Sequence, residues 1–170
     1  LTNNMKKGVV QKAYREWFQE EFEPVTMITL TFREDVSSEK AWGLFKKWVH
    51  EINHHVIGKH YKRQYKHSYF GYIVTAERQA RGTIHYHLVV DNYIPYKFAQ
   101  SVWWRIGGFI KIKKVTDAPG SIRYLLKYLT KADIDPVIWR VKKKYIHPET
   151  FDVNETVQEK LDSVPGNYHE

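Results

Sequence analysis

The chain has 170 residues, of which 42% are hydrophobic, 15% are aromatic and none is cysteine. This length and hydrophobic content fit one globular domain with its own core, and the lack of cysteine excludes disulfides and thiolate metal sites. The net charge is +8, but residues 149–170 carry −5, which leaves +13 on residues 1–148. Such a basic body favours a polyanion such as nucleic acid as partner, although positive charge also serves solubility.

The charge distribution predicts one basic domain over residues 1–148 and an acidic, flexible tail over residues 149–170. No stretch has the apolar length needed to cross a membrane, and nothing at the start resembles a signal peptide. We therefore expect a cytoplasmic protein without a membrane partner.

Taken in chain order, the apolar spacing predicts a helix, a strand, a long helix, two strands of a hairpin, a helix, a strand, a helix and an edge strand. The predicted segments are residues 5–22, 24–33, 37–60, 67–78, 82–92, 96–106, 109–115, 121–132 and 137–146. Within the third helix, Trp103 and Trp104 are adjacent, so one is expected to pack and the other to be partly exposed, with the core as the safer assignment for each. The long helix is expected to start at Ser38.

The strands alternate polar and apolar residues, as residues 24–33 illustrate with Thr29 and Thr31 on one face and Leu30 on the other. This pattern is typical of an antiparallel sheet with one covered face. The predicted fold is therefore α+β: a single antiparallel sheet of about five strands, with helices packed on one face and the active site on the open face.

Two histidines, His85 and His87, stand one residue apart in an otherwise apolar strand, so both point to one face and Tyr86 to the other. Glu77 lies on the preceding strand, within cross-strand reach. One carboxylate and two imidazoles suit a divalent cation with open positions, Mn²⁺ or Mg²⁺ in preference to Zn²⁺ or Ni²⁺. A pair of half-exposed surface histidines is the simpler alternative.

The last predicted helix carries a second polar pattern. Four residues at spacing i, i+3, i+4 and i+7 share one face: Tyr124, Lys127, Tyr128 and Lys131. A phenol with its ordinary pKa of about 10 is a weak nucleophile, and neighbouring ammonium groups favour the phenolate. Beside a cation-activated phosphodiester, such a phenolate could form a phosphotyrosine. A solvated face of tyrosines and lysines is the alternative.

Several cations and hydroxyls are candidate contacts to a nucleic-acid backbone. Residues 59–67 interleave cations with tyrosines, which is typical of a single-strand groove and also of a solvated loop. Threonine hydroxyls on a strand face can reach phosphates, with ordinary β-propensity as the alternative. The candidate DNA-binding residues are Thr29, Thr31, Lys59, Lys62, Arg63, Lys66, Lys111 and Lys113.

Three stretches, in this order, resemble the HUH endonucleases, specifically the rolling-circle replication initiators (Rep) of plasmids and small single-stranded DNA phages. They are MITLTF at residues 27–32, Glu77 followed by His85-Tyr-His87, and YLLKYLTK at residues 124–131. The similarity spans residues 25–135. The resemblance implies that the acid and both histidines bind the divalent cation, Mn²⁺ or Mg²⁺.

The same resemblance implies that Tyr128 is the nucleophile and that Lys131 positions the phosphate or the ion. Tyr124 and Lys127 repeat this spacing, and Tyr124 matches the extra tyrosine of two-tyrosine phage enzymes. Whether Tyr124 also reacts is left open by the sequence.

The implied activity is that of a sequence-specific endonuclease and strand transferase, which nicks single-stranded DNA through a 5′-phosphotyrosine and rejoins the strands. The implied partners are single-stranded origin DNA, with or without a hairpin, and a host helicase; no small-molecule cofactor is expected. Two alternatives remain: a single-tyrosine HUH transposase, and a non-catalytic module that binds single-stranded DNA or RNA on the open sheet face.

Overall fold

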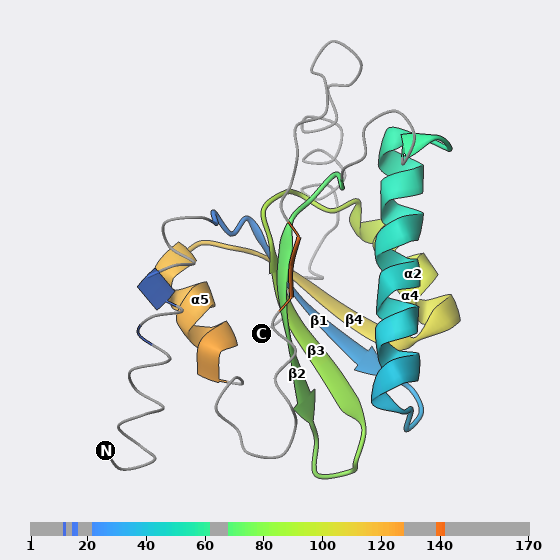
Figure 1. Ribbon diagram of the computed structural model, residues 1–170, viewed down its shortest axis with the longest axis horizontal. Coiled ribbons are helices and arrows are strands. Elements are labelled where there is room, and N and C mark those ends of the chain that lie inside the picture. Colours follow the sequence, from blue (N-terminus) through green and yellow to red (C-terminus); the bar gives the residue numbers. More distant parts are fainter. Residues whose placement is uncertain (1–11, 13–14, 17–21, 62–67, 128–138, 142–170) are drawn as a thin grey trace.

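The computed structural model describes residues 12, 15–16, 22–61, 68–127 and 139–141. Within them the chain forms five strands and three named helices (Figure 1). In chain order they are β1 (Thr26–Phe32), α2 (Ser38–Ile57), β2 (Tyr72–Arg78), β3 (Ile84–Val90), α4 (Tyr96–Ile106), β4 (Gly108–Lys114), α5 (Ala118–Leu126) and β5 (Trp139–Val141). Most of the helix predicted over residues 5–22, and the whole acidic tail, lie outside the described residues.

The five strands form one sheet in the order β4-β1-β3-β2-β5, and each described pair is antiparallel. β2 and β3 are the predicted hairpin, whose turn is closed by a hydrogen bond from Gln79 N to Thr83 O at 2.9 Å. Gly82 has a φ of +89° in this turn, a conformation that glycine adopts without strain. The predicted α+β class with a single antiparallel sheet is confirmed.

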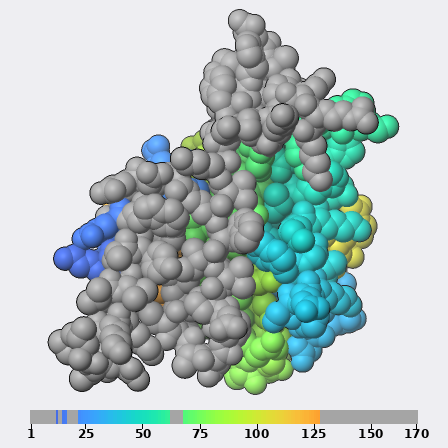
Figure 2. Space-filling model, viewed as in Figure 1, coloured from blue at the N-terminus to red at the C-terminus, as the bar shows by residue number. Residues whose placement is uncertain are grey.

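One face of the sheet carries the main core beneath α2 and α4 (Figure 1). The alternation in β1 is confirmed, since Ile28, Leu30 and Phe32 are buried on this face. Trp48 of α2 is fully buried, and its Nε1–H donates to the backbone oxygen of Ala99 in α4 at 3.0 Å. The outer surface of α2 faces solvent along one side of the molecule (Figure 2).

The starts of two helices follow their capping residues. α2 begins at Ser38 as predicted, because the hydroxyl of Ser37 accepts a hydrogen bond from Lys40 N at 3.2 Å. α5 begins three residues before the predicted Ser121, because Asp117 accepts a hydrogen bond from Gly120 N at 2.9 Å. Pro119 and Gly120, which precede the predicted helix, therefore form its first turn, where proline is tolerated.

The prediction that the helices pack on one face is wrong for α5, which lies on the opposite face from α2 and α4 (Figure 1). The residues that carry this contact are Ile122, Leu125 and Leu126 of α5, with Phe22, Ile73 of β2 and Val89 of β3. β2 and β3 have apolar side chains on both faces at this end, and such a surface is stable only when covered. α5 covers this part of the second face.

The expectation that one tryptophan packs while its neighbour is partly exposed is confirmed, and the core assignment is wrong for Trp104. Trp103 is fully buried, whereas Trp104 is 55% exposed. Adjacent residues on a helix point about 100° apart, so a single packed face does not hold both rings.

Two core tyrosines provide a test of this packing. Burial raises the pKa of Tyr72 and of Tyr86 to about 12. The contribution of these neutral phenols to stability is therefore complete below their ordinary pKa of about 10, and it is lost as pH rises towards about 12. We expect the urea midpoint of unfolding to fall between about pH 9 and about pH 11.5, and the fall to be smaller in Tyr86→Phe. Equal falls in both proteins would contradict this assignment.

Candidate functional site

The second face of the sheet carries two rows of mostly polar side chains beside α5. Residues paired across antiparallel strands point to the same face, so the register aligns one residue from each of four strands. The first row runs across β4, β1, β3 and β2 as Phe109, Thr31, His85 and Glu77. The second row runs in the same order as Lys111, Thr29, His87 and Thr75.

The next row towards α5 is apolar at its centre and belongs to the second hydrophobic cluster, between α5 and the sheet, which we call the small core. Ile73 and Val89 are buried beneath α5, and Met27 packs against them. The two polar rows and α5 enclose a cleft of about 810 Å³, whose lining includes Tyr124 of α5. The position of α5 therefore sets how close a helix residue comes to the histidines.

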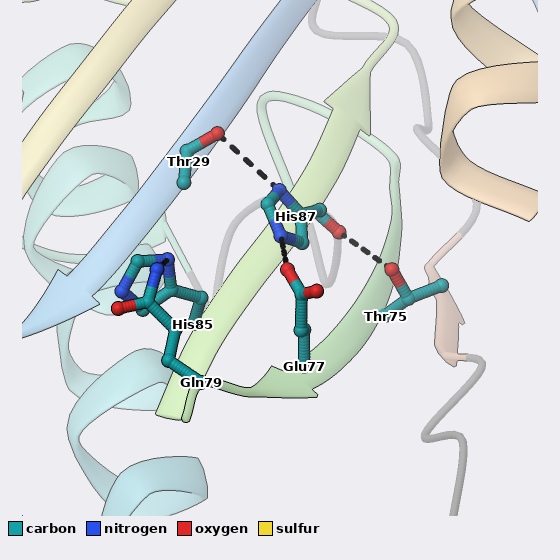
Figure 3. Close-up of polar contacts among 6 residues, drawn as sticks. All are labelled: Thr29, Thr75, Glu77, Gln79, His85 and His87. Atoms are coloured by element: carbon teal, nitrogen blue, oxygen red, sulfur yellow. Dashed lines mark hydrogen bonds and ion pairs between the residues drawn. The ribbon is translucent and has the colours of Figure 1, made fainter. Parts of the chain in front are cut away.

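His87 and Glu77 are hydrogen-bonded within the cleft (Figure 3). The Nε2–H of His87 donates to Oε2 of Glu77 at 2.9 Å, and the two side chains are only 6% and 20% exposed. In this tautomer the hydroxyl of Thr29 donates to Nδ1 of His87, at 3.4 Å. Because water is largely excluded, the interaction of the carboxylate with the imidazole is stronger than at the surface.

His85 is paired across the strands with Glu77, yet the carboxylate bonds to His87 instead. Nδ1 of His85 lies 3.1 Å from Nε2 of Gln79, while Nε2 of His85 is buried and has no hydrogen-bond partner among the described residues. The centres of the two imidazole rings are 6.2 Å apart. A buried ring nitrogen without a partner costs free energy, and a bound ligand would remove that cost.

The surroundings of both imidazoles favour the neutral form. Burial is the largest cause, and it lowers the pKa of His85 and of His87 below the ordinary value of 6.5, against the opposing effect of Glu77. Lys127 adds a smaller lowering of the pKa of His87. The neutral form is the one that can bind a metal ion through a ring nitrogen.

The donor set fits a divalent cation in its chemistry. Behind each histidine, at Nδ1, lies a group that can either donate or accept a hydrogen bond: the Thr29 hydroxyl or the Gln79 amide. Nε2 of each ring can therefore serve an ion. In the described geometry Glu77 and His87 satisfy each other, and no three His, Asp or Glu side chains among the described residues are arranged to hold an ion. Binding would exchange that hydrogen bond for coordination.

Tyr124 approaches His87 from α5. The centres of the two rings are 5.8 Å apart and their planes are nearly perpendicular, at 84°. Nζ of Lys127 lies 4.1 Å from the centre of the Tyr124 ring, within the range of a cation–π contact. The phenol ring of Tyr124 thus contacts an imidazole of the sheet, and the ammonium of Lys127 contacts that phenol ring.

The cleft brings together some of the predicted residues. Four predicted DNA contacts line it: Thr29, Thr31, Lys111 and Lys113. Lys59 is exposed just beyond the end of α2 and is not among the lining residues. Five predicted site residues lie outside the described residues: Lys62, Arg63, Lys66, Tyr128 and Lys131. Their roles stay predictions.

Among the cleft residues that the sequence did not indicate are Gln79 and Phe109. Gln79 stands two positions after Glu77, so the strand alternation that selected Glu77 could also have selected it. Phe109 joins the site only through the pairing of β4 with β1, and the sequence does not give that register.

The fold and the site define an α+β protein with an acid, two neutral histidines and lysines on one sheet face and a tyrosine-bearing helix beside them. The family described as replication-associated protein ORF2 matches residues 25–133, more than half of the chain, and the chain belongs to this family. It is therefore a replication-associated protein.

Comparison with curated proteins and with solved structures finds no match to this chain. None of the described helices has the length and apolar character that a membrane span requires.

The lowered pKa values of His85 and His87 predict a loss of stability in acid. Because their pKa is lowered on folding, the unfolded chain takes up protons first as pH falls through about 6.5, and the unfolded state gains. We expect the urea midpoint to fall between about pH 7.5 and about pH 5.5, and the fall to be smaller in His85→Gln. The exposed His60→Gln is the matched control. A fall that is unchanged in His85→Gln would contradict the assignment.

Proposed function

We propose that the protein is a rolling-circle replication initiator of the HUH type, which nicks single-stranded origin DNA and transfers the strand. The observation that carries this proposal is the approach of Tyr124 to His87 beside Glu77 and His85, in a cleft lined by lysines. Membership of the replication-associated family supports it. The three stretches that resemble the HUH motifs occur in the family's order, and they include Glu77, His85, His87 and Tyr124.

In this proposal Glu77, His85 and His87 hold one divalent cation, Mn²⁺ or Mg²⁺. Such an ion supplies Lewis-acid activation of a phosphoryl oxygen. The unpartnered Nε2 of His85 and the lowered pKa of both histidines support this use of the site. A carboxylate among the ligands favours these ions over metals that prefer nitrogen alone.

The chain itself supplies the nucleophile and the cations. A phenol oxygen attacks phosphorus, the bond from phosphorus to the 3′ oxygen breaks, and the phosphate remains on tyrosine as a 5′ ester. The phenol loses its proton and the departing 3′ oxygen takes one up. Lys127, and Lys131 in the sequence pattern, favour the phenolate by their charge. The ester keeps the bond energy, so a 3′ hydroxyl can reverse the step without ATP.

The nucleophile is proposed to be Tyr128, with Tyr124 four residues before it. Lys111 and Lys113 lie on the sheet face beside the histidines and are proposed to bind phosphates of the DNA. The proposed partners are single-stranded origin DNA, with or without a hairpin, and a host helicase. A single-tyrosine transposase would use the same chemistry.

A second candidate is a non-catalytic module that binds single strands on the same face. It is favoured by the hydrogen bond between Glu77 and His87, which satisfies both groups without an ion. The two functions differ in one product, the covalent link between protein and DNA.

The covalent link can be detected directly. We expect the protein, incubated with Mn²⁺ and candidate single-stranded origin DNA, to form an adduct that survives SDS. Tyr128→Phe should lower the yield of adduct at least about a thousandfold, as loss of a nucleophile does. Tyr124→Phe should still form an adduct, because Tyr128 is retained. Tyr93→Phe, which removes a phenol outside the cleft, is the matched control.

The reverse pattern would assign the nucleophile to Tyr124, and loss in each single variant would indicate that both phenols are needed. An adduct that survives when both tyrosines are replaced would refute the proposed nucleophiles. No adduct with any candidate origin would favour the binding module.

Metal binding is a separate test. Glu77→Gln keeps the shape of the side chain and removes its charge, so we expect the affinity for Mn²⁺, measured by titration calorimetry, to fall at least about tenfold to a hundredfold. Glu39→Gln, an exposed acid in the first turn of α2, should bind Mn²⁺ as the unchanged protein does. Equal affinity in Glu77→Gln would contradict the proposed ligand set.

A further inference from the structure

The described surface exposes two large hydrophobic side chains, and they are neighbours. Trp104 is 55% exposed and Phe109 is 50% exposed, and their ring centres are 5.2 Å apart with an edge-to-face angle of 73°. Exposed aromatic rings in contact are costly to leave in water, and such patches commonly mark a binding surface.

Arg33, itself exposed, holds this pair together. Its guanidinium lies 4.8 Å from the centre of the Trp104 ring and 5.9 Å from that of Phe109. The Nη2–H of Arg33 also donates to the backbone oxygen of Trp104 at 2.8 Å. The two rings and the cation therefore form one ordered group, which we name the aromatic patch.

Two glycines set the position of the patch. Gly107 and Gly108 connect α4 directly to β4, so the last turn of the helix and the first outward residue of the strand lie side by side. A Cβ atom at Gly108 would overlap the carbonyl oxygen of Thr31. Arg33 N in turn donates to Gly107 O at 2.9 Å. The chain thus fixes all three members of the patch through its backbone.

The patch is continuous with the cleft. Phe109 is the first member of the row that continues through Thr31 to His85, and it lines the cleft. On the same face of β4, two positions further along, stands the exposed Lys111, which also lines the cleft. A strand of nucleic acid bound at the histidines would therefore contact aromatic rings and lysines at the β4 edge of the sheet.

We propose that Arg33, Trp104 and Phe109 form a stacking platform for unpaired bases of single-stranded DNA at the edge of the cleft. Aromatic rings and a guanidinium are the groups on which bases stack without sequence preference, and lysines beside them match the phosphates. The net charge of +13 on residues 1–148 favours this occupant over an apolar protein partner. The platform rests on the proposed function only in taking single-stranded DNA as its ligand.

The test measures binding of the whole chain to labelled oligothymidylate by fluorescence anisotropy, without metal. Trp104→Leu keeps an apolar side chain and removes the aromatic face, and we expect the Kd to rise about fivefold to a hundredfold. Trp104→Phe should retain most of the affinity. Phe98→Leu removes a ring from α4 that stacks on His55 instead, and its Kd should match that of the unchanged protein.

A second probe isolates stacking from charge. An oligomer of equal length with abasic sugars has the same phosphates, so its Kd should be equal for Trp104→Leu and for the unchanged protein. Two results for Trp104→Leu would overturn the platform. One is an unchanged Kd for oligothymidylate, which would favour a protein partner for the aromatic patch. The other is an equal rise in Kd for the abasic oligomer. The adduct assay on the unchanged protein reports on the proposed function independently. If the adduct forms and the Kd of Trp104→Leu is unchanged, only the platform is rejected. If the Kd of Trp104→Leu rises and no adduct forms, only the nuclease is rejected.

Discussion

The site depends on the register of β3 between β1 and β2. A shift of one residue would turn His85 and His87 into the main core and place Tyr86 in the cleft, because side chains alternate at every step. The register is held by Tyr86, whose buried ring contacts Phe32 and Phe45 edge to face, with centres 5.5 Å and 5.6 Å apart. A large ring that fits only the aromatic core thus fixes the two imidazoles on the opposite face.

The second face of the sheet is divided between packing and chemistry. Where β2 and β3 present Ile73 and Val89, α5 covers them with its leucines, and where the strands present polar residues, the face is open to the cleft. The same helix that buries Leu125 presents its neighbour Tyr124 to His87. The distance between the phenol and the imidazole is therefore a consequence of hydrophobic packing, and a change in the small core would move the phenol.

Local patterns in the sequence were sufficient for the strands, for the hairpin and for the shared face of His85 and His87, because these depend on periodicity alone. The side of the sheet that a helix covers depends on which strand surface is left apolar, and this requires the strand order, so α5 was assigned to the wrong face. The core assignment of Trp104 failed for a local reason, because α4 has a single packed face and Trp103 occupies it. The hydrogen bond from His87 to Glu77 was missed because it is diagonal, whereas strand pairing sets Glu77 across from His85.

The diagonal bond also explains how a half-buried acid and two histidines can lie side by side without an ion. A neutral imidazole carries one proton, and with that proton on Nε2, His87 satisfies the carboxylate while Thr29 satisfies Nδ1. With the proton on Nδ1 instead, the threonine oxygen accepts and Nε2 offers its lone pair. A hydroxyl behind the ring therefore suits either tautomer, which a carbonyl or an ammonium would not. The amide of Gln79 can serve His85 in the same way through its two ends. Burial favours this arrangement further, because it lowers the pKa of both rings and so disfavours the doubly protonated form, which has no lone pair to offer an ion.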